Sequence, residues 1–266
     1  MESTAPLVQL RNISKAYGSV QALLNVDLDL YASEVLALVG DNGAGKSTLA
    51  KIVSGAHQPD TGDIVIDGRP CVLSTPLDAK RLGIEMLYQD LGLLENLSVA
   101  ANVFLGREIP LRLLGRPSAW MDTQEMARRT RGLLQQYGLE IDSPDRSVAA
   151  LSGGQRQLIA IARSALWGSR LIVLDEPTAA LGVRESARVL DIVRQLRKGG
   201  VAVLVISHNL EHVFSIADRI AVLRRGRNAG TLQTSESTPS DVVHYITGAE
   251  FGHLNGSTQT RVAEGP

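Results

Sequence analysis

The sequence predicts an α/β fold in which helices cover both faces of a largely parallel sheet. The evidence begins with short apolar runs at 35–39 and 171–174, which contain no polar residue. Such runs are typical of strands that are buried on both faces. They alternate along the chain with segments such as 184–197, where apolar residues recur at helical spacing. Strands that alternate with helices in this way favour a parallel sheet.

Length and composition limit the organisation and the partners of this chain. Its 266 residues are 44% hydrophobic, which suits one large domain, or a core with a subdomain. The net charge is −1, so there is no bulk electrostatic reason to bind nucleic acid or an anionic membrane. A lone cysteine, Cys71, excludes an internal disulfide framework and fits a reducing compartment. Because no long apolar run is present, we expect a cytoplasmic protein whose membrane role, if any, comes through a partner.

The pattern along the chain predicts one domain over residues 1–248 with three kinds of segment. Residues 7–30 alternate apolar and polar side chains, which indicates antiparallel strands with one wet face. The core and this β subdomain together take about 7–94 and 168–247. Residues 95–167 are predicted to form an inserted helical subdomain, interrupted by a loop near 106–118. The polar, aperiodic residues 249–266 are expected to be a disordered tail.

A phosphate-binding loop is predicted directly after the buried strand 35–39. Its residues are Gly40, Asp41, Asn42, Gly43, Ala44, Gly45, Lys46 and Ser47, and we add the following Thr48 to the nucleotide-binding set. The glycines let backbone N–H groups turn toward a phosphate, and the start of the next helix adds positive potential. Lys46 can reach the β- and γ-phosphates of ATP, and the Ser47 hydroxyl can bind Mg²⁺. A glycine-rich turn with a surface lysine is the alternative.

Two carboxylates and a histidine follow other buried strands. Asp175 ends the run 171–174, and a Mg²⁺ beside Ser47 would balance its buried charge. Glu176 points the opposite way and can act as a general base toward water, unless both carboxylates are simply exposed at the strand end. His208 follows the strand 201–207, where a ligand crevice is expected, and can contact the γ-phosphate. A purely structural role is the alternative for His208.

Two further candidates stand before the helical subdomain and before the phosphate loop. Gln89 ends the strand predicted at 83–89, and its amide can complete a Mg²⁺ shell, hold the attacking water, and report the nucleotide state to the helical subdomain. Taken alone, Gln89 is an ordinary polar residue. Tyr17 can stack on adenine, with a core or turn tyrosine as the competing interpretation.

A second anion-binding turn is predicted at Ser152, Gly153, Gly154 and Gln155. Ser152 is a good N-cap, and the glycines allow a phosphate to approach the start of the following helix closely. Only one phosphate-binding loop exists in the sequence, and we see no internal repeat. We therefore expect this turn to face the ATP that is held by a second copy of the chain, in a twofold dimer.

In their order and spacing these motifs resemble the ATP-binding-cassette family over about residues 7–247, and 151–155 (Leu-Ser-Gly-Gly-Gln) match its signature motif without departure. The resemblance implies a RecA-like P-loop NTPase core with an antiparallel β subdomain and an inserted helical subdomain. Gly182 stands where the family commonly has Asp, a carboxylate that helps communication across the dimer. Residues 88–91 (Tyr-Gln-Asp-Leu) and 102–108 (Asn-Val-Phe-Leu-Gly-Arg-Glu) are similar to the monosaccharide-importer branch.

This resemblance implies an ATPase that drives a separate integral membrane permease, with an external or periplasmic sugar-binding protein in the complex. The protein would then lie on the inner face of the cell membrane, and the permease would dock near residues 89–104. A cassette ATPase that acts on ribosomes or DNA, a cassette for another solute, an exporter, and a nucleotide-binding regulator without turnover are the alternatives. The sequence shows no coiled-coil insertion or strongly basic arm that would favour nucleic acid as a partner.

Overall fold

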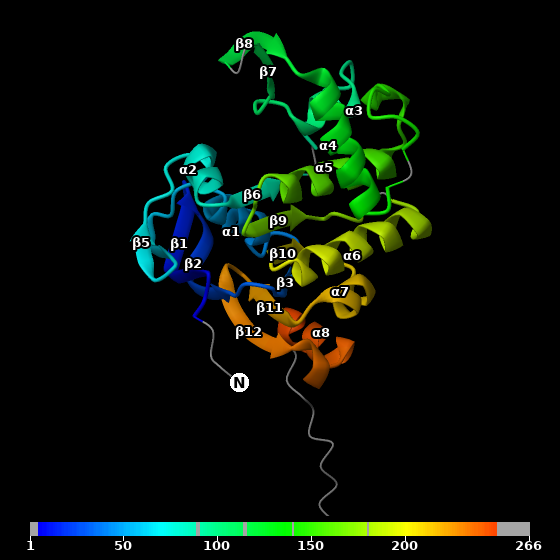
Figure 1. Cartoon of the computed structure of the whole chain (residues 1–266). Coiled ribbons are helices and arrows are strands. Elements are labelled where there is room, and N and C mark those ends of the chain that lie inside the picture. The colour runs from blue at the N-terminus through cyan, green and yellow to red at the C-terminus, as the bar shows by residue number, and fades with distance from the viewer. Residues whose placement is uncertain (1–4, 89–90, 114–115, 140, 180, 249–266) are drawn as a thin grey trace, which may run out of the picture.

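The computed structural model describes residues 5–88, 91–113, 116–139, 141–179 and 181–248. Its centre is a six-stranded sheet with the order β12–β11–β3–β10–β9–β6 (Figure 1). The strands are β3 (Val35–Val39), β6 (Ile84–Leu87), β9 (Leu171–Asp175), β10 (Ala202–Ile206), β11 (Arg219–Arg224) and β12 (Arg227–Gln233). All neighbouring pairs are parallel except β11 with β12. The predicted α/β fold with a largely parallel sheet is therefore confirmed.

Alternating side chains on the central strands build two separate apolar cores. On β3, Val35, Ala37 and Val39 join one buried cluster, whereas Leu36 and Leu38 join the other. The first cluster lies under α5 (Gly153–Leu166), α6 (Val183–Lys198), α7 (Leu210–Ile216) and α8 (Pro239–Thr247). The second lies under α1 (Lys46–Val53) and the N-terminal strands. Both faces of the sheet are covered, which explains why its strands read as unbroken apolar runs.

The N-terminal strands form a second, antiparallel sheet with the order β2–β1–β4–β5. Its strands are β1 (Val8–Tyr17), β2 (Val20–Leu30), β4 (Thr61–Ile66) and β5 (Arg69–Cys71). On β2 the buried side chains of Val26, Leu28 and Leu30 alternate with exposed or half-buried ones. The sheet therefore has one wet face, as the sequence predicts. Helix α2 (Pro76–Arg81) follows it and begins at a Thr75 capping box.

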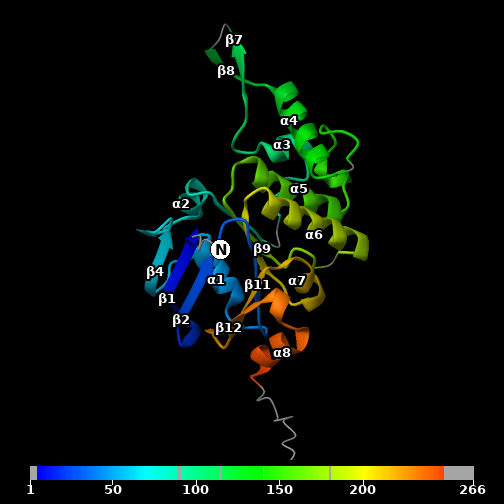
Figure 2. The same cartoon turned by 60° about the horizontal axis from the view of Figure 1, so that its bottom comes forward.

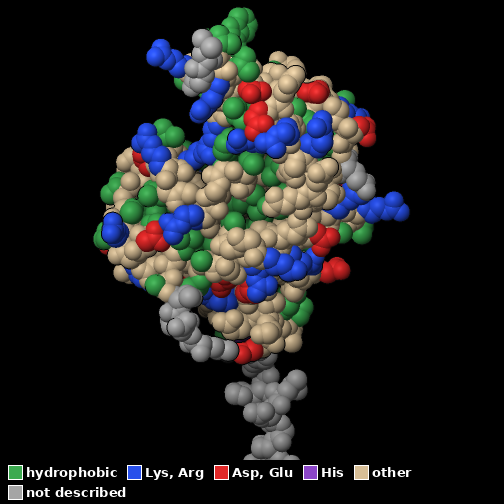
Figure 3. Space-filling model, viewed as in Figure 1, with side chains coloured by type: hydrophobic (Ala, Val, Ile, Leu, Met, Phe, Trp, Pro, Cys, Tyr) green, Lys and Arg blue, Asp and Glu red, His purple; other side chains and the backbone are tan. Residues whose placement is uncertain are grey.

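Residues 95–167 contain a further group of helices, in which α5 packs against the central sheet and the others lie beyond it (Figures 1 and 2). They are α3 (Val99–Val103), α4 (Thr123–Gln136), the short 3₁₀ turn η1 (Val148–Ala150) and α5; a second 3₁₀ turn, η2 (Thr234–Glu236), follows β12. The loop expected near 106–118 is wrong in part, because β7 (Pro110–Leu113) and β8 (Arg116–Met121) pair there as an antiparallel hairpin. The hairpin projects from the helices and carries hydrophobic and Lys or Arg side chains on its surface (Figure 3).

Two expectations are limited by what the structure describes. The tail predicted at 249–266 lies outside the described residues, as does Gln89 at the end of the strand predicted over 83–89. Within the described part of the chain, no helix has both the length and the apolar character needed to cross a membrane.

Candidate nucleotide-binding site

The phosphate-binding loop turns between β3 and α1 with a backbone that only glycine adopts easily. Gly45, the residue before α1, has φ of 104°. A side chain there would also lie 2.5 Å from the Ala22 carbonyl oxygen and 2.7 Å from the Leu23 side chain. The loop is therefore pressed against β2, and this close approach fixes where the start of α1 points. The start of α1 supplies unpaired N–H groups and positive potential, as anion binding requires.

Lys46 is held inside this loop. Its side chain is buried, and its Nζ donates to the carbonyl oxygens of Gly40 at 2.7 Å and Asp41 at 2.9 Å. Burial lowers the pKa of Lys46, and the nearby carboxylates of Glu176 and Asp175 act in the opposite direction. Both hydrogen-bond acceptors of this ammonium are neutral carbonyl oxygens, and a charged phosphate oxygen would be a stronger acceptor in their place.

Asp175 ends β9 beside the first turn of α1. Burial raises the pKa of Asp175 above its ordinary value, while a hydrogen bond with the Ser47 hydroxyl and the charge of Lys46 lower it in part. The structure thus brings together Ser47 and Asp175, the two described residues that the sequence predicts as metal ligands. In the described part of the chain no cluster of three or more His, Cys, Asp or Glu side chains could hold a metal by itself.

Glu176 and His208 meet at the ends of two neighbouring strands. Parallel pairing places Asp175 opposite Ile206, so the residues that follow β9 and β10 emerge at the same edge. His208 Nδ1 lies 2.8 Å from Glu176 Oε1, with the histidine side chain 72% exposed and the glutamate 25%. Glu176 also has φ of 49°, a left-handed conformation that is costly for a non-glycine residue and is common at functional sites.

These residues surround two cavities of about 390 Å³ each. The first is lined by the loop residues from Asn42 to Thr48 together with Val20, Gln21, Ala22, Asp175, Glu176 and Ile206. The second is lined by Gly40, Asp41, Asn42, Ser207 and His208, among others. Asn42 lines both, so the cavity beside the carboxylates and the cavity beside the histidine adjoin at the phosphate-binding loop. The sequence did not predict that the β2 residues Val20–Ala22 line the cavity. They lie there because β2 pairs with β1 as an antiparallel hairpin.

Tyr17 lies at the edge of this region. It pairs with Val20, which lines the first cavity, but Tyr17 itself is not among the lining residues. The residue is 42% exposed, and its ring packs edge-on against His57, with 5.8 Å between ring centroids. The Lys15 ammonium lies over the ring, 5.7 Å from its centroid, so base stacking by Tyr17 stays a proposal.

The second predicted anion turn begins α5 but does not share the phosphate-loop cavity. Ser152 caps the helix in a reciprocal box: Gln155 N–H donates to Ser152 Oγ at 3.2 Å, and Ser152 N–H donates to Gln155 Oε1 at 3.1 Å. None of Ser152, Gly153, Gly154 and Gln155 lines either cavity described above. Ser152, Gly153 and Gln155 are exposed or half-buried. The turn therefore lies apart from the chain's own phosphate-binding loop.

The sheet, the loop and the carboxylates at its edge define the class of this protein, a P-loop nucleotide-binding ATPase. Sequence comparison gives the family: the model described as "ABC transporter" matches residues 23–179. The chain therefore belongs to the ABC transporter family.

Several curated relatives match most of the chain. The fructose import ATP-binding protein FrcA of Rhizobium meliloti is 45% identical over 92% of this chain and 95% of its own length. The xylose/arabinose import ATP-binding protein XylG of Sulfolobus acidocaldarius is 40% identical over 94% of this chain and 97% of its own. The ribose import ATP-binding protein RbsA 1 of Streptomyces coelicolor is 42% identical, and the chain spans 48% of its length.

Solved structures agree with this assignment. A nucleotide-free ATP-binding cassette of an ABC transporter superposes with a TM-score of 0.77 and 25% identity, over 90% of this chain and 98% of that one. A dimeric bacterial ABC transporter cassette gives 0.72 and 25%, over 85% of this chain and 98% of that one. The resemblance inferred from the motifs is thus confirmed at the level of family and fold.

The raised pKa of Asp175 makes a prediction about stability and pH. An acid whose folded pKa lies above its unfolded value destabilises the fold as pH rises through that interval, because the native state must release a buried proton. We expect Asp175→Asn to raise the melting temperature of the nucleotide-free protein, with a gain that grows as pH rises above the ordinary Asp range. Thermal melts from pH 4 to pH 8 measure this. A variant that melts below the wild type across that range contradicts it.

Proposed function

We propose that this chain hydrolyses ATP and couples hydrolysis to the import of a simple sugar through a separate membrane permease. The observation that carries the proposal is the Glu176–His208 pair at 2.8 Å, at the sheet edge beside the phosphate-binding loop. Import and sugar class are supported by the names of the relatives, which are fructose, xylose/arabinose and ribose import proteins.

Each of the residues at the cavity has a separate role in the transfer of a phosphoryl group to water. Lys46 can exchange its loop carbonyls for phosphate oxygens, and the start of α1 adds backbone N–H donors. Glu176 is placed to accept a proton from water, and His208 holds its carboxylate through Oε1. Because the histidine side chain is largely exposed, it is also free to contact a terminal phosphate.

We further propose that Mg²⁺ accompanies the nucleotide, with Ser47 and Asp175 as its protein ligands. The donor set fits this ion, since Mg²⁺ is usually held by one or two protein oxygens together with phosphates and water. The half-buried Asp175 carboxylate, whose pKa is raised by burial in spite of the nearby Lys46, supports the assignment, because a bound cation would offset this cost of burying its charge. Bound there, Mg²⁺ would neutralise developing phosphate charge. Gln89, proposed as a further ligand, lies outside the described residues.

A second copy of the chain completes the site in this proposal. The Ser152–Gln155 turn begins a 14-residue helix, its residues Ser152 and Gly153 are exposed, and it does not line the cavity at the chain's own phosphate-binding loop. Two chains related by a twofold axis would each offer this turn to the nucleotide on the other's loop. Loss of the γ-phosphate would then weaken the contact between the two chains, which turns hydrolysis into motion.

Replacing the proposed base separates binding from turnover. Glu176→Gln keeps the hydrogen bond to His208 within reach but removes the group that accepts a proton, so we expect kcat to fall at least about a hundredfold. Nucleotide affinity should stay within about threefold of the wild type, and ATP should hold the variant as a dimer. Phosphate release and light scattering with ATP test this. Glu211→Gln, an acid on α7 outside the cavities, is the control. Unchanged turnover would exclude Glu176 as the base.

Mixing two inactive variants tests whether the site is shared. Lys46→Ala disables the loop, and Ser152→Arg blocks the helix tip with a bulky side chain; each homodimer should hydrolyse ATP poorly. A mixed dimer contains one site with both parts intact, since the good loop of one chain meets the good tip of the other. We expect the mixture to regain activity, measured as phosphate release at a fixed total concentration. If mixed dimers form and remain inactive, the shared-site proposal is wrong.

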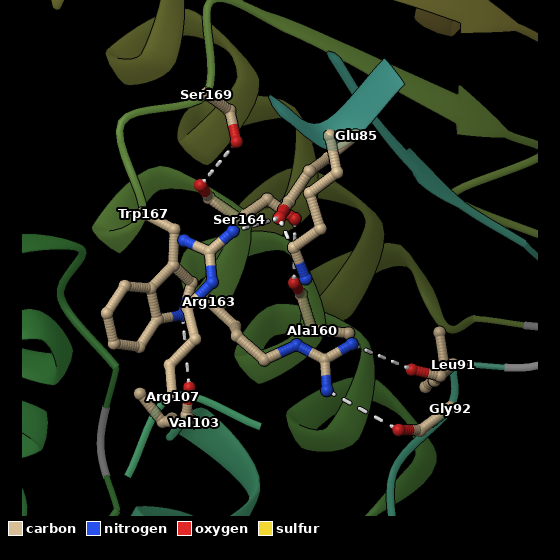
Figure 4. A network of polar contacts seen from close by, with 11 residues as sticks. Glu85, Leu91, Gly92, Val103, Arg107, Ala160, Arg163, Ser164, Trp167 and Ser169 are labelled. Carbon is tan, nitrogen blue, oxygen red and sulfur yellow. Dashed lines mark hydrogen bonds and ion pairs between the residues drawn. The ribbon is translucent and has the colours of Figure 1, made fainter. Parts of the chain in front are cut away.

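The proposed docking surface for the permease is a groove between the central sheet and the helices of 95–167. This cavity of about 320 Å³ is lined by Lys80, Glu85, Leu105, Arg163 and Trp167, among others. Figure 4 shows Arg163 reaching from α5 to the carbonyl oxygens of Leu91 and Gly92, at 3.4 Å each.

The polar side of the groove is largely cationic. Glu85 is already shared by Lys80 at 3.5 Å and Arg107 at 3.8 Å, and Arg107 also stacks over the Trp167 ring at 4.7 Å (Figure 4). Burial lowers the pKa of Arg163, and Glu85 acts against it. With this single acid surrounded by three cations, the groove suits an amphipathic permease segment that carries a carboxylate. Docked there, the protein would lie on the inner face of the cell membrane, in a complex that includes an external sugar-binding protein.

A charge at the rim of this groove should uncouple the two subunits. Leu105 lines the groove and is 41% exposed, so Leu105→Arg should fold normally while opposing an apolar permease segment. We expect less than about a tenth of wild-type recovery of permease from co-expressing membranes, as for loss of a central interface contact. ATPase activity of the isolated subunit should not change. Val72→Arg, at an 80% exposed apolar residue in the loop after β5, is the matched control. Equal recovery by both variants would place docking elsewhere.

A further inference from the structure

One side chain fills the space beside two glycines that are distant in sequence. A methyl group built on Gly154 would lie 2.9 Å from Glu185 Cβ and would collide with its Cγ. A methyl group on Gly182 would lie 2.7 Å from Glu185 Oε2. The stem of Glu185 therefore covers the helix tip at Gly154, and its carboxylate lies against Gly182. A larger residue at 154 would therefore displace the stem of Glu185, whereas one at 182 would displace only its carboxylate.

Glu185 is the acidic residue of the first turn of α6, which begins at Val183 after the Gly182 cap. Gly182 provides no side-chain cap for this helix. The carboxylate thus lies between the starts of two helices, α5 and α6, where the positive ends of both dipoles favour a negative charge. The side chain is half-buried, and in the part of the chain that the structure describes its carboxylate has no hydrogen bond or ion pair with another side chain.

The location of Glu185 links two parts of the proposed site. The chain leaves β9 at Asp175, passes Glu176 and returns into α6 through Gly182, while α5 begins at the Ser152 turn. These two segments approach each other at Glu185, and they lie side by side in both views of the fold (Figures 1 and 2). A shift of the helix tip at Gly154 must therefore move Glu185, and with it the segment that follows the proposed base.

We propose that Glu185 is a positioning residue that fixes the Ser152–Gly154 tip relative to the segment after Glu176, and that it supplies the carboxylate which residue 182 lacks. This inference rests on the proposed function, because the tip acts on the nucleotide of a second chain. On this proposal, the glycine at 182 does not mean that the chain lacks a carboxylate at this place. The acid stands three residues later, and its side chain folds back over the glycine to reach the same place.

A carboxylate-transfer experiment tests this. Glu185→Ala removes the acid, and Gly182→Asp adds a second acid where its Cβ is 2.7 Å from Glu185 Oε2. We expect each single variant to lose between about tenfold and a hundredfold in kcat, because misplaced catalytic parts cost that much. The double variant Gly182→Asp/Glu185→Ala has room for the new side chain and again one carboxylate. It should recover most of the lost kcat.

Further measurements separate positioning from folding. Each variant should keep wild-type affinity for ATP, since the phosphate-binding loop is untouched, and should differ in kcat and in ATP-dependent dimer formation in the Glu176→Gln background. Glu185→Gln keeps the shape and loses the charge, so it should be impaired if the carboxylate matters. Asp191→Asn removes another acid from α6, one that is 63% exposed and paired with Arg194, and should behave as wild type.

The outcomes are distinguishable. If the wild type neither hydrolyses ATP nor dimerises with it, the proposed function fails. If the wild type does both and Glu185→Ala matches it, or if the double variant is no better than the worse single variant, the inference about Glu185 is overturned while the proposed function stands.

Discussion

The parallel pairing of β3, β10 and β9 is the constraint on which the site depends. Hydrogen bonding in register sets Ile206 opposite Leu38 on one side and Asp175 on the other. Every side chain that leaves these strands at their carboxyl ends therefore emerges at one edge of the sheet, as parallel topology requires. The phosphate-binding loop follows the first strand, Glu176 follows the last, and His208 follows the strand between them. Three segments that are remote in sequence thus become one site, in which Glu176 contacts His208 and Asp175 contacts Ser47.

The central sheet and the phosphate-binding loop could be predicted because local sequence dictates them. A strand buried on both faces has to be apolar throughout, and a loop that approaches a neighbouring strand within van der Waals contact has to contain glycine, as Gly45 does beside Ala22. The hairpin at 110–121 could not be predicted. Both of its strands contain Pro, their side chains are mostly exposed, and no alternation of buried and exposed residues marks them.

The contacts between distant elements also could not be predicted from the sequence. Val20–Ala22 reach the cavity because β2 folds back along β1, and the turn between these strands carries no chemical motif. In the same way, Gly182 reads as the loss of an acid when the sequence is taken alone. Glu185 can reach back over Gly182 within the first turn of α6, but only the packing of α6 on α5 places its stem over Gly154. Side-chain direction across a helix pair depends on tertiary packing, which residue spacing does not encode.

The apolar core explains how a displacement of the Ser152–Gly154 helix tip would be transmitted to other parts of the chain. Leu151 at the helix tip, Leu174 on β9 and Val189 on α6 belong to one buried cluster, together with Val103 and Phe104 near the groove. Close-packed interiors move as units, since separating their side chains opens voids that cost free energy. The helix tip, the strand that carries the proposed base and the groove proposed for the permease are therefore parts of one packed body. If a nucleotide on a second chain moves the tip, as proposed, this shared packing is the physical path by which the movement would reach the proposed docking groove.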